Sequence, residues 1–122
     1  MKRFFEDFEQ TATENKDLRR VLYTGTHLQL VLMALKRGEE TGEDVHPEHD
    51  QFFRVEKGKG ELILEGDRVT LKTNDAVIVP AGAHHNVINT SDKPMKLFMI
   101  YAPPHDAVVV AGETREASAR GS

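Results

Sequence analysis

The hydrophobic positions of this chain alternate with polar ones over short stretches, which is typical of β-strands. The longest such stretch, residues 27–35, is largely apolar on both faces, so we expect both faces to be covered. Further strands are predicted near residues 21–23, 51–56, 61–65, 68–72, 75–79, 85–89 and 95–101, and residues 108–110 could add an edge strand. Short strands with closely spaced turns indicate an antiparallel sandwich or closed barrel.

Two local features qualify this all-β pattern. Residues 1–20 predict a short amphipathic helix with Phe4, Phe5 and Phe8 on one side, followed by a polar loop that includes Thr11, Thr13 and Asn15. We expect the phenylalanines to cover an open edge or end of a sheet. Residues 66–67, Gly-Asp, predict a tight hairpin, and the leading glycine favours the type II′ turn.

Length and composition narrow the class of protein. The 122 residues suffice for one domain, and 39% hydrophobic with 30% charged residues fits a soluble globular protein, for which we expect a cytoplasmic location. No stretch is apolar enough to span a membrane, and a net charge of -4 without a basic face argues against nucleic acid as a partner. Because the chain has no cysteine, any metal must be held by histidine and oxygen ligands.

Candidate chemistry is concentrated just before one predicted strand. Six side chains there could offer a metal an oxygen or a nitrogen: Asp44, His46, Glu48, His49, Asp50 and Gln51. Asp44 and His46 are two residues apart on an extended chain and so face the same way, and Gln51 shares a face with the apolar positions that follow it. His85 comes from a later strand that a barrel can bring alongside, while its neighbour His84 must point outward.

Residues 44–60 and 74–89 together resemble the two motifs of the cupin superfamily of metal-binding jelly-roll barrels. The first motif has a His-x-His pair, then a Glu, then a glycine. Anchoring it on Gly58 puts Asp44 and His46 at the histidine positions and Gln51 at the Glu position. The second motif is matched by Pro80, Gly82, His85 and Asn89, with Asn74 in place of its leading glycine.

The resemblance implies a small, sugar-isomerase-like single-domain cupin: an N-terminal helix and lead-in strand at 1–25, a jelly-roll barrel at 26–104, and a partly disordered tail at 105–122. It also implies a divalent metal (Zn, Ni, Mn or Fe) held by Asp44, His46, Gln51 and His85. The usual shell of three histidines and one glutamate has a formal ligand charge of minus one, and the substituted set keeps that charge. Two histidines with one carboxylate also resemble the facial triad of non-haem iron enzymes.

Simpler interpretations of the same residues stay open. His46 and His85 could be hydrogen-bonded residues in a barrel without metal, and Asp44 and Gln51 could orient ligands instead of binding metal. His49 is expected at the rim, with a role as substitute ligand as the alternative. His27 and Gln29 are assigned to core or edge packing, with lining of the cavity as the alternative. His105 is assigned to the tail, and Phe52 and Arg54 to a dimer contact or exposed surface.

The fold class hosts many activities, so function rests on the site. We expect a small-molecule substrate, most simply a sugar or sugar acid that is isomerised or epimerised, with Glu48 as the candidate catalytic base. A non-haem-metal dioxygenase and a non-catalytic metabolite-binding protein are the alternatives. The resemblance and the strands that are apolar on both faces also predict a homodimer.

Overall fold

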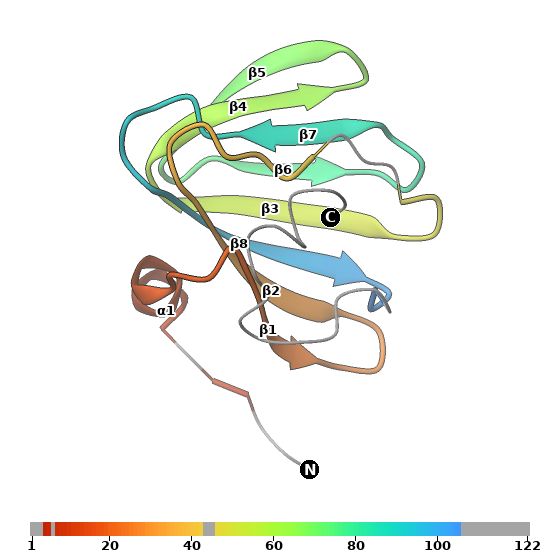
Figure 1. Ribbon diagram of the computed structural model, residues 1–122. Helices are drawn as coiled ribbons and strands as arrows, with labels where there is room; N and C mark the ends of the chain where they lie inside the picture. Colours follow the sequence, from red (N-terminus) through yellow and green to blue (C-terminus); the bar gives the residue numbers. More distant parts are fainter. Residues whose placement is uncertain (1–3, 6, 43–45, 106–122) are drawn as a thin grey trace.

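The computed structural model describes residues 4–5, 7–42 and 46–105 (Figure 1). This part of the chain forms one helix and eight strands. Their bounds are α1 Phe8–Glu14, β1 Arg19–Thr24, β2 Gln29–Leu35, β3 Asp50–Lys57, β4 Lys59–Leu64, β5 Asp67–Lys72, β6 Ala76–Val79, β7 His85–Ile88 and β8 Met95–Ala102. Each predicted strand in this part is present.

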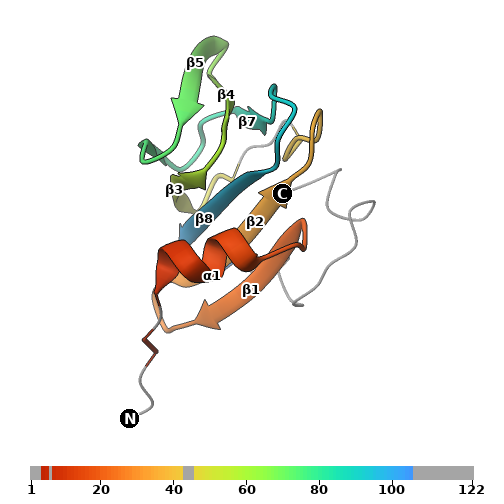
Figure 2. The same ribbon diagram turned by 90° about the vertical axis from the view of Figure 1, so that its left-hand side faces the viewer.

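The strands form two antiparallel sheets that face each other (Figures 1 and 2). A five-stranded sheet has the order β1-β2-β8-β3-β6, and a three-stranded sheet has the order β5-β4-β7. The chain changes sheet four times, between β3 and β4, β5 and β6, β6 and β7, and β7 and β8. The predicted all-β jelly-roll with a short N-terminal helix is confirmed.

Strand β2 explains why both faces of residues 27–35 are apolar. All seven of its residues are buried. Val31, Met33 and Leu35 pack in the core between the two sheets, whereas Leu30 and Leu32 belong to a second cluster on the outer face. Burial on both faces favours such continuous apolar strands by about 25 cal/mol for each Å² removed from water.

Helix α1 covers that outer face, in front of β2 and β8 in Figure 2. The ring of Phe8 lies 5.3 Å from that of Phe98 on β8, near the middle of the five-stranded sheet. Phe4 does pack at an edge, 5.1 Å from the ring of Tyr23 on the edge strand β1, so the expectation of an edge cover holds for Phe4 and not for Phe8. Phe5 also departs from it, since its side chain is 93% exposed and does not join the packed side.

The helix also lies later in the chain than expected. Asp7 is its N-cap and accepts a hydrogen bond from the Gln10 N–H at 3.1 Å. Thr11 and Thr13 lie inside the helix, so the predicted polar loop at these residues was wrong. Packing against the sheet stabilises a helix that threonines alone would disfavour.

The β4–β5 hairpin has a different turn from the expected one. Leu64 pairs with Asp67, which leaves Glu65 and Gly66 as the two turn residues. Their φ angles are 49° and 86°, and positive φ at both positions is the signature of a type I′ turn. The type II′ prediction was wrong because Asp67 pairs in the ladder and the turn starts one residue earlier.

Helix α1 has seven residues, and no helix in the described residues is long and apolar enough to cross a membrane. The possible edge strand at residues 108–110 lies outside the described part.

Candidate metal-binding site

The turn between β6 and β7 fixes the two candidate motifs to each other. The Gly82 N–H donates a hydrogen bond to the His46 carbonyl oxygen at 2.9 Å. Ala81, which precedes Gly82 in the turn, donates its N–H to Asp50 Oδ1, also at 2.9 Å. Gly82 has φ +88°, a conformation that glycine adopts at little cost. The second motif therefore presents His85 from a turn that is docked directly on His46.

His46 and His85 lie side by side at the end of the barrel where β3 and β7 begin, which we call the mouth. His46 is 6% exposed and His85 is 2% exposed, and their ring centroids are 5.8 Å apart. His85 Nδ1 lies 3.3 Å from the Ala83 carbonyl oxygen, which leaves Nε2 as the nitrogen on the other side of the ring. His84 is exposed, as the alternation of side chains predicted.

Gln51 is linked to the histidine pair through Tyr101. It pairs in register with Tyr101, whose ring is 5.5 Å from that of His46, and it is 2% exposed. Its Nε2 lies 3.4 Å from Met99 Sδ. Its buried Oε1 has no hydrogen-bond partner among the described residues. A buried amide oxygen left in this way costs free energy, so it marks a place where a ligand would be stabilised.

This donor set fits a metal ion in part. Imidazole nitrogens bind divalent metals at about 2.0–2.1 Å, so two rings on one tetrahedral ion have centroids about 5 Å apart, and the 5.8 Å between His46 and His85 is somewhat longer. Gln51 adds an oxygen donor. The described residues contain no group of three or more His, Asp or Glu side chains that could hold a metal. Asp44, the fourth predicted ligand, lies outside them.

Two further histidines line the same mouth. His105 Nε2 lies 2.9 Å from His46 Nδ1, and its ring is stacked on that of His49 with centroids 4.8 Å apart and planes 3° apart. His49 is half-buried, as expected of a rim residue, and its Nδ1 lies 2.8 Å from the Pro103 carbonyl oxygen. The sequence assigned His105 to the tail. Its place at the mouth depends on contacts across the fold, for which the sequence carries no local signal.

The other polar side chains of the first motif have separate places. Glu48, the candidate base, is exposed on the turn between His46 and His49. Asp50 is used structurally by the turn at Ala81, as described above. The structure thus brings His46 and His85 together, places the buried Gln51 at the same end of the barrel, and leaves Glu48 exposed.

The remaining motif residues support the fold. Asn74 has φ 76°, the conformation that the family's glycine supplies at this position, and it accepts a hydrogen bond from Arg54 at 3.1 Å. A Cβ on Gly58 would lie 2.8 Å from the Pro94 carbonyl oxygen. Asn89 is fully buried and ties the β7–β8 loop to the end of β2. None of these side chains reaches the histidines.

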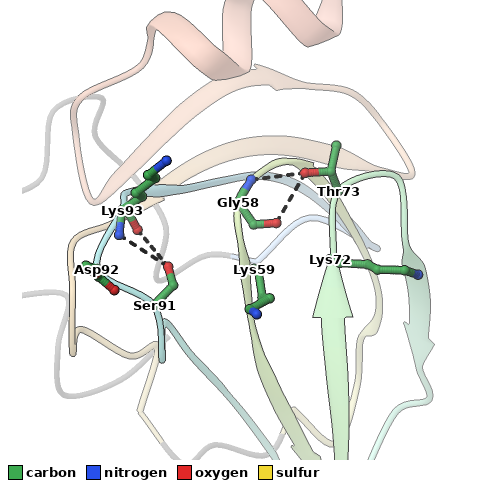
Figure 3. Close-up of a pocket in the computed structure, with 7 residues that line it drawn as sticks. All are labelled: Gly58, Lys59, Lys72, Thr73, Ser91, Asp92 and Lys93. Carbon is green, nitrogen blue, oxygen red and sulfur yellow. Dashed lines mark hydrogen bonds between the residues drawn. The ribbon is translucent and has the colours of Figure 1, made fainter.

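A separate hollow of about 480 Å³ lies at the opposite end of β3 (Figure 3). It is lined by Gly58, Lys59, Lys72, Thr73, Ser91, Asp92 and Lys93. The Lys72 side chain extends away from Lys59 and Lys93, and its ammonium pairs with Asp75 at 3.1 Å. The positive charges do not converge, so the histidine mouth is the stronger candidate site.

Comparison with known proteins places this geometry in a family. The family model described as the Cupin domain matches residues 31–101. The chain belongs to the cupin family. This cupin superposes on the BH2720 protein of Bacillus halodurans with a TM-score of 0.90 and 37% identity, over 94% of this chain and 92% of that one. It is 40% identical to YrkC of Bacillus subtilis over 121 residues, 93% of this chain.

Two more distant relatives carry names that state an activity. One is the pectin degradation protein KdgF of Dickeya dadantii, 29% identical over 75% of this cupin and 86% of that protein. The other is gentisate 1,2 dioxygenase 1 of Aquipseudomonas alcaligenes, 33% identical over 67% of this cupin and 24% of that protein. The chain spans between 50% and 64% of the length of the first three curated relatives that it matches.

Proposed function

We propose that this cupin binds one divalent metal ion (Zn, Ni, Mn or Fe) through His46, His85 and Gln51, with Asp44 as a further ligand, and acts on a small polar substrate. The substrate class that we favour is a sugar or sugar acid, and the reaction an isomerisation or epimerisation. The relationship to a protein named for pectin degradation supports this substrate class.

One observation carries the proposal. Two buried imidazoles, with centroids 5.8 Å apart, share the mouth of the barrel with a buried amide oxygen that lacks a hydrogen-bond partner among the described residues. Buried polar atoms in proteins are almost always satisfied, so this arrangement favours an additional bound group. Imidazole and amide donors suit a divalent ion of borderline hardness.

The residues around the mouth suggest how a substrate is handled. A bound metal would act as a Lewis acid toward hydroxyl or carbonyl oxygens. Glu48, exposed on the turn beside the mouth, is the proposed base that takes a proton from the substrate. The stacked rings of His49 and His105 lie beside His46, and the buried ring of Tyr101 packs against both of them.

Metal analysis tests this proposal most simply. Protein purified without chelator, or refilled with Mn, Fe, Ni or Zn, should hold about one ion per chain, and His85→Ala should lose it. His84→Ala is the matched control, because this neighbouring histidine is exposed and lies just before β7. Wild type that retains no ion after refilling with any of the four metals would overturn the proposal. The loaded protein is then assayed with uronic acids and keto sugars, and Glu48→Gln should abolish turnover while leaving the metal in place.

A dioxygenase is the second candidate, and the similarity to gentisate 1,2 dioxygenase 1 favours it. This reaction needs a redox metal with open coordination positions and consumes oxygen. If the protein converts an aromatic acid and this activity stops under anaerobic conditions, the dioxygenase would replace the isomerase as the proposed function. Binding of a metabolite without any product in either assay would indicate the non-catalytic alternative.

We also propose that the chain forms a homodimer through the part of the five-stranded sheet's outer face that lies near β6, beside helix α1. Ile78 is 65% exposed there and pairs in register with Phe52, which in turn pairs with Ile100, so an apolar row crosses three strands. Single substitution Ile78→Glu should convert a dimer into a monomer in light scattering. A wild-type monomer at micromolar concentration would contradict the proposal.

A further inference from the structure

His105 is held in place by four residues, three of them from distant parts of the chain. Its backbone N–H donates to Gln29 Oε1 at 3.1 Å. Its ring stacks on His49 at 4.8 Å and meets Tyr101 edge-on at 4.9 Å. Its Nε2 lies 2.9 Å from Nδ1 of His46. A side chain with this many fixed neighbours presents its nitrogen in a defined direction.

The bond between the two rings constrains the tautomer of His46. In the hydrogen bond between His46 Nδ1 and His105 Nε2, one nitrogen carries the hydrogen and the other offers the lone pair. If His46 Nδ1 donates, the Nε2 of His46 has the lone pair that a metal requires. If His46 Nδ1 accepts, its Nε2 carries the hydrogen and cannot bind a metal.

We propose that His105 is a positioning residue for His46: its Nε2 accepts the hydrogen bond from His46 Nδ1–H and so keeps His46 Nε2 available as a metal-binding nitrogen. This inference rests on the proposed metal site. Metal-binding histidines generally donate their other N–H to a neighbouring acceptor, which fixes the ring and raises its basicity. Here the acceptor comes from the segment after β8, next to the mouth through which a substrate would enter.

Gln29 holds His105 in place and so supports the bond between His105 and His46. Its Nε2 donates to Thr24 Oγ1 at 3.0 Å, which sets the amide so that Oε1 accepts the His105 backbone N–H. Gln29 is 4% exposed and lies at the start of β2. The sequence assigned Gln29 to packing, and the structure shows it as the anchor of His105.

Metal titration gives the first test. His105→Ala should weaken binding of Ni²⁺ or Zn²⁺ by about 10- to 100-fold, the usual effect of removing such an acceptor. His105→Gln should recover most of the affinity. Its amide oxygen can accept from His46 Nδ1–H, and its backbone N–H can still donate to Gln29 Oε1. His84→Ala should bind as wild type. Equal affinity for wild type and His105→Ala would overturn the inference.

The tautomer can be measured without any metal. Nitrogen-15 NMR at about pH 8, above the ordinary histidine pKa of about 6.5, should show His46 protonated at Nδ1 in wild type and shifted toward the Nε2–H form in His105→Ala. His46 protonated at Nε2 in wild-type protein would overturn the inference. If wild type binds no metal, the proposed function fails by itself, and this spectrum still decides whether His105 sets the tautomer of His46.

Discussion

The buried side chain of Asn89 should stabilise the fold without contributing to the metal site. Its Nδ2 donates to the carbonyl oxygens of Leu35 at 2.9 Å and Lys93 at 2.8 Å, and its Oδ1 accepts from the N–H and the hydroxyl of Ser91 at 2.9 Å each. The residue is 0% exposed. Asn89→Ala would therefore remove four hydrogen bonds at once.

The size of the effect follows from which partners stay buried. A buried polar group left without its partner costs about 1–3 kcal/mol. The Leu35 carbonyl belongs to a fully buried strand residue, whereas the Lys93 carbonyl and the Ser91 N–H lie in a more exposed turn that water can reach. The free energy of unfolding should fall by about 2–4 kcal/mol, which is a large part of the 5–15 kcal/mol typical of a domain.

Urea unfolding measures this loss. With a slope of about 2 kcal/mol/M, the midpoint should fall by about 1–2 M at unchanged slope. Ser91→Ala is the control and should cost about 1 kcal/mol or less, because it removes only the hydroxyl. Metal affinity of folded Asn89→Ala should equal that of wild type. A midpoint shift below about 0.5 M, or lost metal binding at unchanged stability, would refute this reasoning.

Three other substitutions test the fold. Gly60→Ala would put a Cβ 2.3 Å from the Ile88 carbonyl oxygen, so thermal unfolding should show a loss of about 3 kcal/mol or more. Glu65→Asn should raise the free energy of unfolding by about 0.5–1 kcal/mol, because asparagine tolerates positive φ in a type I′ turn better than glutamate; no gain would contradict the turn assignment. The Lys72 backbone N–H, and then its ammonium, hold the pKa of Asp75 below its ordinary 3.8. Stability from this contact is present above about pH 3.8 and is lost as the pH falls through the lower folded value, so Asp75→Asn should flatten the acid side of stability against pH.

Several features of the site could be predicted because they depend on local patterns. Residues two apart on a strand share a face, which correctly put Gln51 inward and separated His85 from His84. The proline and glycine between β6 and β7 indicated a turn that presents His85. The structure adds that the Gly82 N–H of this turn donates to the His46 carbonyl oxygen, which explains why the two motifs lie together.

Other features depend on contacts that a local pattern does not contain. His105 is held by Gln29, 76 positions earlier, and the sequence around it reads as the start of a tail. The hairpin turn depends on which residues pair along the whole ladder, and a shift of one residue changed its type. The helix start did have a local signal, since Asp7 followed by Gln10 is an N-capping pattern, but the threonines after it favoured a loop.

The central claim is that one metal ion binds between the two buried histidines. An anomalous difference map from a crystal of the Zn²⁺- or Ni²⁺-loaded protein tests it most directly. The account predicts a single strong peak about 2.0–2.1 Å from a ring nitrogen of both His46 and His85, with the Gln51 amide oxygen facing it. A metal bound elsewhere on the chain, or no peak between these two rings in crystals grown with excess metal, would contradict it.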